Sequence, residues 1–226
     1  MTLYEGVYLA LISRFLASTA ILAASSCAFQ DAQTEITGRA LEATVQIKCD
    51  TSQGSGYVIS RDGLIATANH VMKECDNPKV VFANGTELKP QILGQDDVHD
   101  VALLKVTGDY KPIPWANSDE VRPGERVFVI GNPFGLGLSV SEGIISAVGR
   151  VFEGLPLKYL QFDAAANPGN SGGPVINEYG YSVGMAEAIY GRASPFGPAT
   201  NIGIGAAIPS NVVRKSVDAI FHARPA

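Results

Sequence analysis

A single serine among glycines is the residue of this chain best suited to covalent chemistry. Ser171 lies in the segment 167–174, whose sequence is NPGNSGGP. Glycines let a backbone turn two amides toward one point, so one short loop can present both a nucleophile and the donors that stabilise an oxyanion. The segment therefore predicts a serine nucleophile, with an oxyanion hole formed by the amides of Gly169 and Ser171.

A serine hydroxyl is a poor nucleophile at neutral pH and needs a base within hydrogen-bond reach. The chain contains three histidines, His70, His99 and His222. His70 follows the apolar segment LIATA, where an expected strand ends and a loop begins. Such a position presents a side chain into a cleft, so we predict that His70 is the base.

The base must in turn be oriented by a third group. Asp100 directly precedes the apolar run VALLKV, which would fix its carboxylate at the start of a buried strand. Asp96 and Asp97 compete for this role but lie further from that strand. Each residue alone is more often structural, but the order His70, Asp100, Ser171 is that of chymotrypsin-like proteases and not of subtilisins or α/β-hydrolases. The sequence thus predicts a serine endopeptidase.

Composition excludes several other classes. The chain has 226 residues, of which 46% are hydrophobic and 17% charged, as in an ordinary globular core. The net charge is -5 and no cluster of lysine and arginine is present, which argues against nucleic acid as a partner. No group of His, Cys and carboxylate residues has the spacing of metal ligands, so no metal site is expected.

The N-terminal segment 1–28 differs from a globular sequence. An apolar run of small residues, FLASTAILAASSCA, follows Arg14. Its length and its small-residue end are typical of a cleaved signal peptide, because a bilayer span needs about 20 residues. A retained anchor and a lipid-modified Cys27 are the alternatives. We expect export to the periplasm or the medium, with membrane association only if this segment is retained or lipidated.

Two further cysteines, Cys49 and Cys75, remain as an even pair if Cys27 is removed or lipidated. In an oxidising compartment such a pair forms a disulfide, and the alternative is two unpaired thiols. The sequence leaves both open.

From residue 41 onward the chain consists of short apolar stretches bounded by turn residues, which is typical of an all-β sandwich or barrel. A Pro-rich polar stretch at about 107–124 separates two halves of similar size, at about 41–107 and 125–208. Apolar residues at helical spacing predict a C-terminal helix over about 210–222.

The sequence resembles the bacterial HtrA-type branch of the trypsin-like family from about 41 to 213. The matching segments are GSGYVIS (54–60), TANHV (67–71), DVALLKV (100–106), GNPFGLG (131–137), GIISAVGR (143–150), DAAANPGNSGGP (163–174) and AIPSN (207–211). The resemblance implies two perpendicular six-stranded antiparallel β-barrels with the active site between them. It also implies no cofactor, and polypeptide substrates that are often unfolded.

The sequence departs from that branch in two respects. Members commonly carry a PDZ domain after the protease, whereas this sequence ends soon after AIPSN, so we expect a protease domain over 29–226 and no PDZ domain. The trimers of the family are held by an aromatic-containing N-terminal segment, and here only Phe29 precedes residue 41 after the apolar run. The resemblance therefore does not settle whether the chain forms a trimer or another oligomer.

The resemblance also suggests where the first specificity pocket lies. The expected pocket residues are Ala165, Glu187, Ile204, Gly205 and Ala206. Ala165 stands six residues before Ser171, where cleavage after Lys or Arg requires an acid, so small or medium aliphatic residues are the expected preference. Two environments are open for Glu187: it faces solvent, or it lies at the pocket rim and attracts a basic side chain.

Two rival functions fit parts of the sequence. GNSGG matches the nucleophile turn of an α/β-hydrolase esterase, but that fold needs its acid and base after the serine, and Asp218 and His222 have the spacing of one helix face. A non-catalytic chaperone or binding module on a protease fold is the other alternative. The intact set of His70, Asp100 and Ser171 argues against it.

Overall fold

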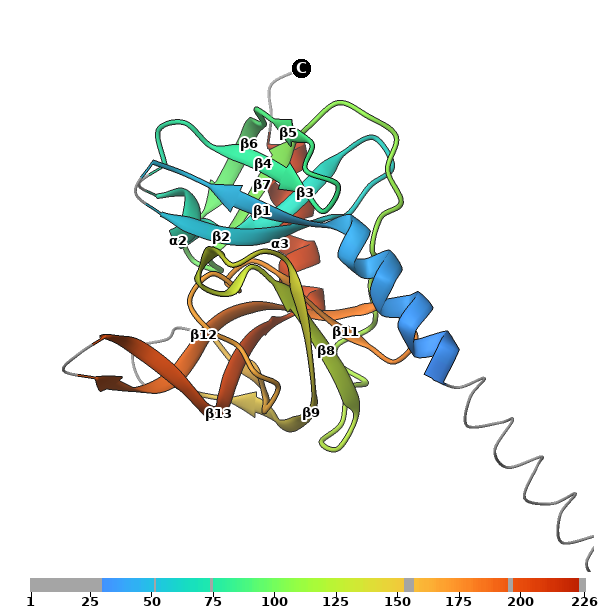
Figure 1. Cartoon of the computed structure of the whole chain (residues 1–226), viewed down its shortest axis with the longest axis vertical. Helices are drawn as coiled ribbons and strands as arrows, with labels where there is room; N and C mark the ends of the chain where they lie inside the picture. The colour runs from blue at the N-terminus through green and yellow to red at the C-terminus, as the bar shows by residue number, and fades with distance from the viewer. Residues whose placement is uncertain (1–29, 51, 74, 153–156, 195–196, 224–226) are drawn as a thin grey trace, which may run out of the picture. The chain divides into compact units, whose positions relative to one another are not determined.

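The computed structural model describes residues 30–223, except 51, 74, 153–156 and 195–196, and gives the backbone alone for 188–202. The expected signal peptide or anchor at 1–28 lies outside these residues. A helix covers 30–43, and the rest of the described chain is mostly strand (Figure 1). None of the helices in the described part of the chain is both long and apolar enough to span a membrane.

The first half of the chain forms a seven-stranded antiparallel sheet of order β5-β4-β1-β2-β3-β7-β6. Its strands are β1 (Thr44–Lys48), β2 (Gln53–Val58), β3 (Leu64–Ala68), β4 (Lys79–Phe82), β5 (Glu87–Leu88), β6 (Gln91–Asp96) and β7 (Val101–Lys105). The inner strands bury large side chains completely, among them Ile47, Tyr57 and Leu103. Burial of these apolar side chains drives the sheet to curve around its own core.

This first sheet differs from the six-stranded closed barrel that the resemblance implies. It has seven strands, and no pairing is recorded between β5 and β6 at its two ends. The extra strand arises because the turn at Asn84 and Gly85 folds a two-residue strand, β5, back onto β4. So short a strand offers few groups for closing the sheet, which remains a half-barrel.

The second half forms a closed barrel of order β10-β13-β12-β11-β8-β9. Its strands are β8 (Arg126–Gly131), β9 (Ser139–Arg150), β10 (Tyr159–Phe162), β11 (Pro174–Asn177), β12 (Ser182–Ser194) and β13 (Gly197–Pro209). Phe162, Ile145 and Leu160 lie at the centre of its core with small alanine and valine side chains. The all-β class and the C-terminal helix are confirmed.

The terminal helix α3 (Ser210–His222) contacts both halves. It buries Val213 and Val217 and packs against β6 and β7 of the sheet and against β12 and β13 of the barrel. Ser216 of α3 donates a hydrogen bond to Asp96 at the end of β6 (2.7 Å). The helix thus ties the half-barrel to the barrel, so the two sheets present their facing loops in a fixed arrangement.

Candidate active site

The pairing of β3 with β7 brings His70 and Asp100 to the same end of the first sheet. Ala68 lies opposite Val101, so the residues just after β3 meet the residue just before β7. His70 lies on the short helix α2 (Asn69–Met72), directly after β3. Both carboxylate oxygens of Asp100 bind it: the backbone amide of His70 donates to Oδ1 (2.7 Å), and Nδ1 lies 2.6 Å from Oδ2.

Asp100 has a left-handed backbone conformation, with φ of 55°. Aspartate tolerates this region better than most residues because its short side chain can bond locally. Its carbonyl accepts a hydrogen bond from the amide of Asn69 (3.0 Å), so main chain and side chain together hold the segment that carries His70. Strained backbone of this kind is concentrated at functional sites.

The environment of His70 favours its protonated form. Burial lowers the pKa of His70, but the hydrogen bond and the negative charge of Asp100, with the charge of Glu187, outweigh burial and raise it above 6.5. Lys73 opposes that rise. A base must be neutral to accept a proton, so chemistry that uses His70 as a base requires a pH above this raised pKa.

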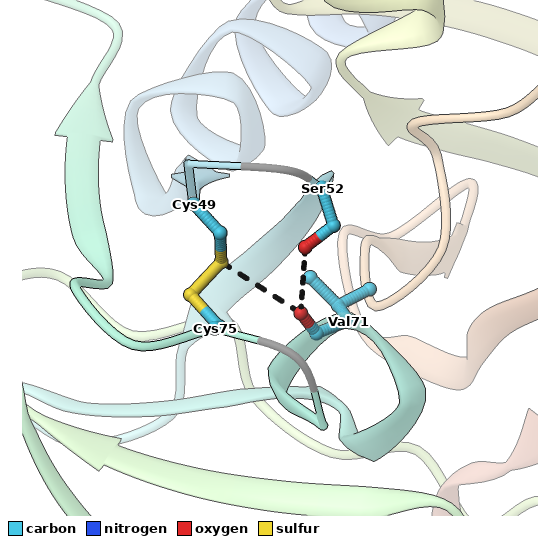
Figure 2. The surroundings of a disulfide bond; sticks show 4 residues. All are labelled: Cys49, Ser52, Val71 and Cys75. Carbon is cyan, nitrogen blue, oxygen red and sulfur yellow. Dashed lines mark hydrogen bonds between the residues drawn. A yellow bond between two sulfur atoms is a disulfide. The ribbon is translucent and has the colours of Figure 1, made fainter.

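A disulfide between Cys49 and Cys75 lies beside this segment, with Cα atoms 5.1 Å apart (Figure 2). The carbonyl oxygen of Val71, the residue after His70, lies 3.7 Å from Cys49 Sγ and accepts a hydrogen bond from Ser52 (3.2 Å). The disulfide and Ser52 therefore both contact α2 next to His70, and they brace the turn that carries it.

The loop of Ser171 presents two amides that no described residue engages. Pro168 uses its carbonyl to accept from Phe134 (2.7 Å), and Asn170 uses its carbonyl to accept from Gly173 (2.9 Å). In a trans peptide the C=O and N–H groups point in opposite directions, so the amides of Gly169 and Ser171 point away from these contacts. Two such amides in one short loop are the donors that an oxyanion hole requires.

Ser55 holds this loop from the other half of the molecule. Its buried hydroxyl donates to the carbonyl of Gly169 (2.7 Å) and accepts from the amide of Asn132 (2.9 Å). Its own amide donates to the carbonyl of Ser171 (2.8 Å). Gly169 has φ of 105°, and a Cβ there would meet the carbonyl of Asn132, so only glycine fits.

Sequence reasoning did not identify Ser55 and Asn132 as residues that contact the nucleophile loop. Both lie in segments that matched the HtrA-type branch, GSGYVIS and GNPFGLG, but nothing in either segment indicates a contact with the nucleophile loop. Ser55 and Gly169 are 114 residues apart in sequence. The glycines on either side of Ser55 were the available signal: a Cβ at Gly54 would collide with the side chain of Val71, and one at Gly56 would be tight against Ala66 and Ile65.

The hydroxyl of Ser171 is bound to the main chain of β12. Its hydroxyl donates to the carbonyl of Glu187 (3.0 Å), and within the described residues no hydrogen bond joins it to His70. The structure therefore places the three predicted residues of the triad in one region but joins only His70 and Asp100 directly.

A pocket of about 210 Å³ lies beside Ser171 and is lined by Ala166, Asn167, Pro168, Asn170, Ser171, Ala186 and Glu187. Of the five residues expected there, this described lining includes Glu187 alone. Ala165 is exposed, and its carbonyl accepts a hydrogen bond from Ser141 (2.5 Å). Gly205 packs against the ring of Phe162 in the barrel core, Ala206 is buried, and Ile204 is partly buried.

The rival acidic residues have other partners. Asp96 binds the ring of His99 (2.7 Å) and the hydroxyl of Ser216. Asp97 accepts from the side chain of Asn69 (2.9 Å) and pairs with Lys73 (3.1 Å). Asp96 and Asp97 therefore support the fold around His70 without contacting its ring.

The remaining histidine, His222, lies at the end of α3, with Nδ1 2.7 Å from the carbonyl of Asp218. This contact between residues four apart is ordinary for a helix end, so the pair is not an acid and base for Ser171.

One cluster has the composition of a cation site. One nitrogen of His70 and one carboxylate oxygen each of Asp100 and Glu187 lie within 4.8 Å of one another. However, Nδ1 of His70 is hydrogen-bonded directly to Asp100, so an ion bound between these two groups would have to break that contact. The arrangement fits proton transfer, with Nε2 of His70 left to act as an acceptor.

Comparison with known proteins gives one matching family. The profile described as "Trypsin-like peptidase domain" matches residues 54–185. The "Probable periplasmic serine endoprotease DegP-like" of Rhizobium meliloti (strain 1021) is 44% identical over 173 residues, which cover 75% of this chain and 33% of the relative. The protein of the same name from Brucella suis biovar 1 (strain 1330) is 41% identical over 174 residues, with the same two coverages. The match thus spans about a third of the length of these relatives.

Solved structures agree with the fold. The "HtrA-type protease AlgW with tripeptide" has a TM-score of 0.79 and 34% sequence identity, over 85% of this chain and 64% of that chain. The "serine endoprotease from Yersinia pestis" has a TM-score of 0.74 and 31% identity, over 84% of this chain and 67% of that chain.

Proposed function

Because the chain belongs to the trypsin-like peptidase family, we propose that it is a serine endopeptidase that cleaves polypeptides through an acyl-enzyme on Ser171. The observation that carries this proposal is the combination of a His70 ring bound to Asp100 with two unengaged amides beside Ser171. The first supplies an oriented base, and the second supplies donors for a developing oxyanion.

Each described contact has a role in this reaction. Asp100 engages Nδ1 of His70, so Nε2 accepts the Ser171 proton as Oγ bonds to the scissile carbonyl carbon. The amides of Gly169 and Ser171 then donate to the carbonyl oxygen as it gains negative charge. The imidazolium gives its proton to the leaving amine, and water repeats the sequence to release the acid.

The hydroxyl of Ser171 must move before it can react. In the described state it donates to the carbonyl of Glu187, so a turn about its Cα–Cβ bond toward His70 precedes attack. Rotamer changes of a single serine are fast compared with turnover, so this step does not limit the rate. Bound substrate beside the pocket would favour the reactive rotamer.

The substrates that we propose are polypeptides with a small or medium aliphatic residue before the scissile bond. The described pocket is small, and apart from Glu187 the residues lining it are uncharged. We place the protein in the periplasm, because the relatives above are named periplasmic and because a disulfide is stable in an oxidising compartment.

Labelling with a fluorophosphonate, followed by cleavage of an unfolded protein, tests this function. We expect the protein to be labelled at one site and to digest unfolded casein, and we expect Ser171→Ala to do neither. Asp100→Asn should lower kcat by about 10⁴-fold because the imidazole loses its tautomer, whereas Asp97→Asn should change kcat only a few-fold. Binding of casein with no labelling and no cleavage would support the non-catalytic module instead.

A further inference from the structure

Glu187 lies at an irregularity in the barrel. Ala186 pairs with Ala207 and Ala188 pairs with Ala206, so Glu187 is an extra residue on β12 between two consecutive partners on β13. A bulge of this kind changes the direction of a side chain and is common beside active sites. Both neighbouring contacts involve the nucleophile loop: the carbonyl of Ala186 accepts from Gly172 (2.7 Å), and that of Glu187 accepts from Ser171 (3.0 Å).

The carboxyl group of Glu187 lies close to the side chains of His70 and Asp100. One of its oxygens lies within 4.8 Å of a ring nitrogen of His70 and of a carboxylate oxygen of Asp100. Its Oε2 atom is fully buried and has no hydrogen-bond partner among the described residues. Of the two environments expected from the sequence, the pocket is the one that the structure supports: Glu187 lines the pocket beside Ser171, and its Oε2 is withdrawn from solvent. The proximity of one of its oxygens to His70 and Asp100 was not expected.

Two negative charges so close together are unfavourable, so one carboxyl group of the pair retains its proton. Burial raises the pKa of Glu187, repulsion from Asp100 raises it further, and attraction to His70 lowers it, which leaves it at about 7. Asp100 accepts two hydrogen bonds from His70, whereas Oε2 of Glu187 has no partner among the described residues, so Glu187 is the group on which the proton is placed.

We propose that Glu187 is a positioning residue of the catalytic pair, whose carboxyl group lies against Asp100 and His70 and sets the protonation equilibrium of His70. This inference rests on the proposed function only in its consequences for the rate. Protonated Glu187 leaves one negative charge facing the imidazole, while ionised Glu187 adds a second. The proton held by Glu187 therefore keeps His70 available as a base near neutral pH.

Tyr159 and Lys73 are the other charged or titratable groups that act on Glu187 and His70. Burial raises the pKa of Tyr159 on β10, and the charges of Glu187 and Asp100 raise it further, so its hydroxyl stays neutral at the pH of activity. Lys73, on the turn after α2, lowers the pKa of His70 and so acts opposite to Glu187. Within this cluster, the two groups that exchange protons near neutrality are thus His70 and Glu187.

Glu187→Gln is the sharpest variant, because the amide has the same shape and can donate to Asp100 but cannot ionise. The acid limb of kcat/KM against pH reports the free enzyme. In the natural chain it should be broader than one ionisation, since two coupled groups titrate together. In Glu187→Gln its midpoint should move to lower pH by about 0.6 unit, which corresponds to the Coulomb energy of one full charge at 4.8 Å in water-like dielectric.

Three control variants separate this role from a structural one. Lys73→Gln should move the limb in the opposite direction, to higher pH. Glu142→Gln removes a carboxylate that pairs with Arg126 outside the cluster, and it should leave the limb unchanged. Glu187→Ala should lower the plateau kcat several-fold with little change in KM, and Glu187→Gln should restore it.

An NMR titration of the His70 ring in the Ser171→Ala background tests the proposal without any catalysis. Addition of Glu187→Gln to that background should lower the pKa of His70. An unchanged titration, or superimposable pH profiles of the natural chain and Glu187→Gln, would overturn the proposal. So would a selective loss of cleavage after Lys and Arg in Glu187→Gln, because Glu187 would then be the charge of the specificity pocket. If fluorophosphonate did not label the protein, the proposed function would be refuted, and the NMR titration alone would decide the role of Glu187.

Discussion

Removal of the disulfide should destabilise the protein and weaken catalysis together, because the disulfide closes the loop that contains His70. The perturbation is the double variant Cys49→Ser/Cys75→Ser. The cysteines are 26 residues apart, and the chain-entropy relation for a loop of that length gives about 3.5 kcal/mol. A loss of that size is a large share of the stability of a typical domain, about 5–15 kcal/mol.

Urea denaturation is the assay, applied to the oxidised protein, the reduced protein and the double variant. We expect the last two to unfold at the same lower urea concentration, and we expect reductant to leave the double variant unchanged. Ser52→Ala is the matched control: it removes one hydrogen bond to Val71 and keeps the disulfide, so it should cost only about 1 kcal/mol.

Peptidase activity under native conditions should fall more in the double variant than its unfolded fraction explains, since the turn after His70 loses a brace. A free energy of unfolding within about 1 kcal/mol of the oxidised protein would refute the reasoning. So would a non-reducing digest in which the peptides of Cys49 and Cys75 are not joined.

Two further substitutions test the supporting contacts. Burial raises the pKa of Asp96, but hydrogen bonds from Ser216 and His99 outweigh burial and lower this pKa. The ionised carboxylate therefore stabilises the folded protein at pH values above its unfolded pKa of about 3.9. This stabilisation is lost as the pH falls through the folded pKa. Ser216→Ala should therefore lower the free energy of unfolding by about 1–2 kcal/mol in urea denaturation at pH 7, and by progressively less toward pH 2. An equal loss at both pH values would contradict this assignment. Gly169→Ala puts a Cβ against the carbonyl of Asn132 at a positive φ, so the amide should leave the oxyanion site and kcat should fall about 10²–10³-fold with KM little changed. A kcat within a few-fold of the natural chain, in steady-state assays of a folded variant, would show that this amide is not a donor.

The sequence predicts the fold class because the periodicity of buried residues is local information. Short apolar stretches between turn residues give strands, and the spacing of Val213, Val217 and Ile220 gives the helix that the structure contains. Closure of a sheet is not local, since it depends on which edge strands meet. The closed six-stranded barrel in the first half was implied by the family resemblance alone, and the structure has a seven-stranded half-barrel there.

The residues of the candidate site likewise include some that local sequence predicts and some that depend on pairing between distant strands. His70, Asp100 and Ser171 are identified by residue type and order, and Gly169 by the conformational freedom of glycine. Glu187 could not be placed, because its direction depends on a bulge created by the pairing of β12 with β13. The three expected pocket residues on β13 are not among the residues that line the pocket beside Ser171, so their role stays a prediction. Phe162 occupies the space against Gly205, and nothing near Gly205 in the sequence indicates that contact.

The contacts of Ser55 mean that the motif around Ser171 is incomplete by itself. The main chain on both sides of the nucleophile is held by one serine from the opposite half of the molecule, through its hydroxyl to Gly169 and its amide to Ser171. A fragment that contained only the second barrel would retain the complete NPGNSGGP motif but would lack both of these hydrogen bonds. A sequence search that uses the nucleophile segment alone will therefore also find chains in which no residue holds that segment.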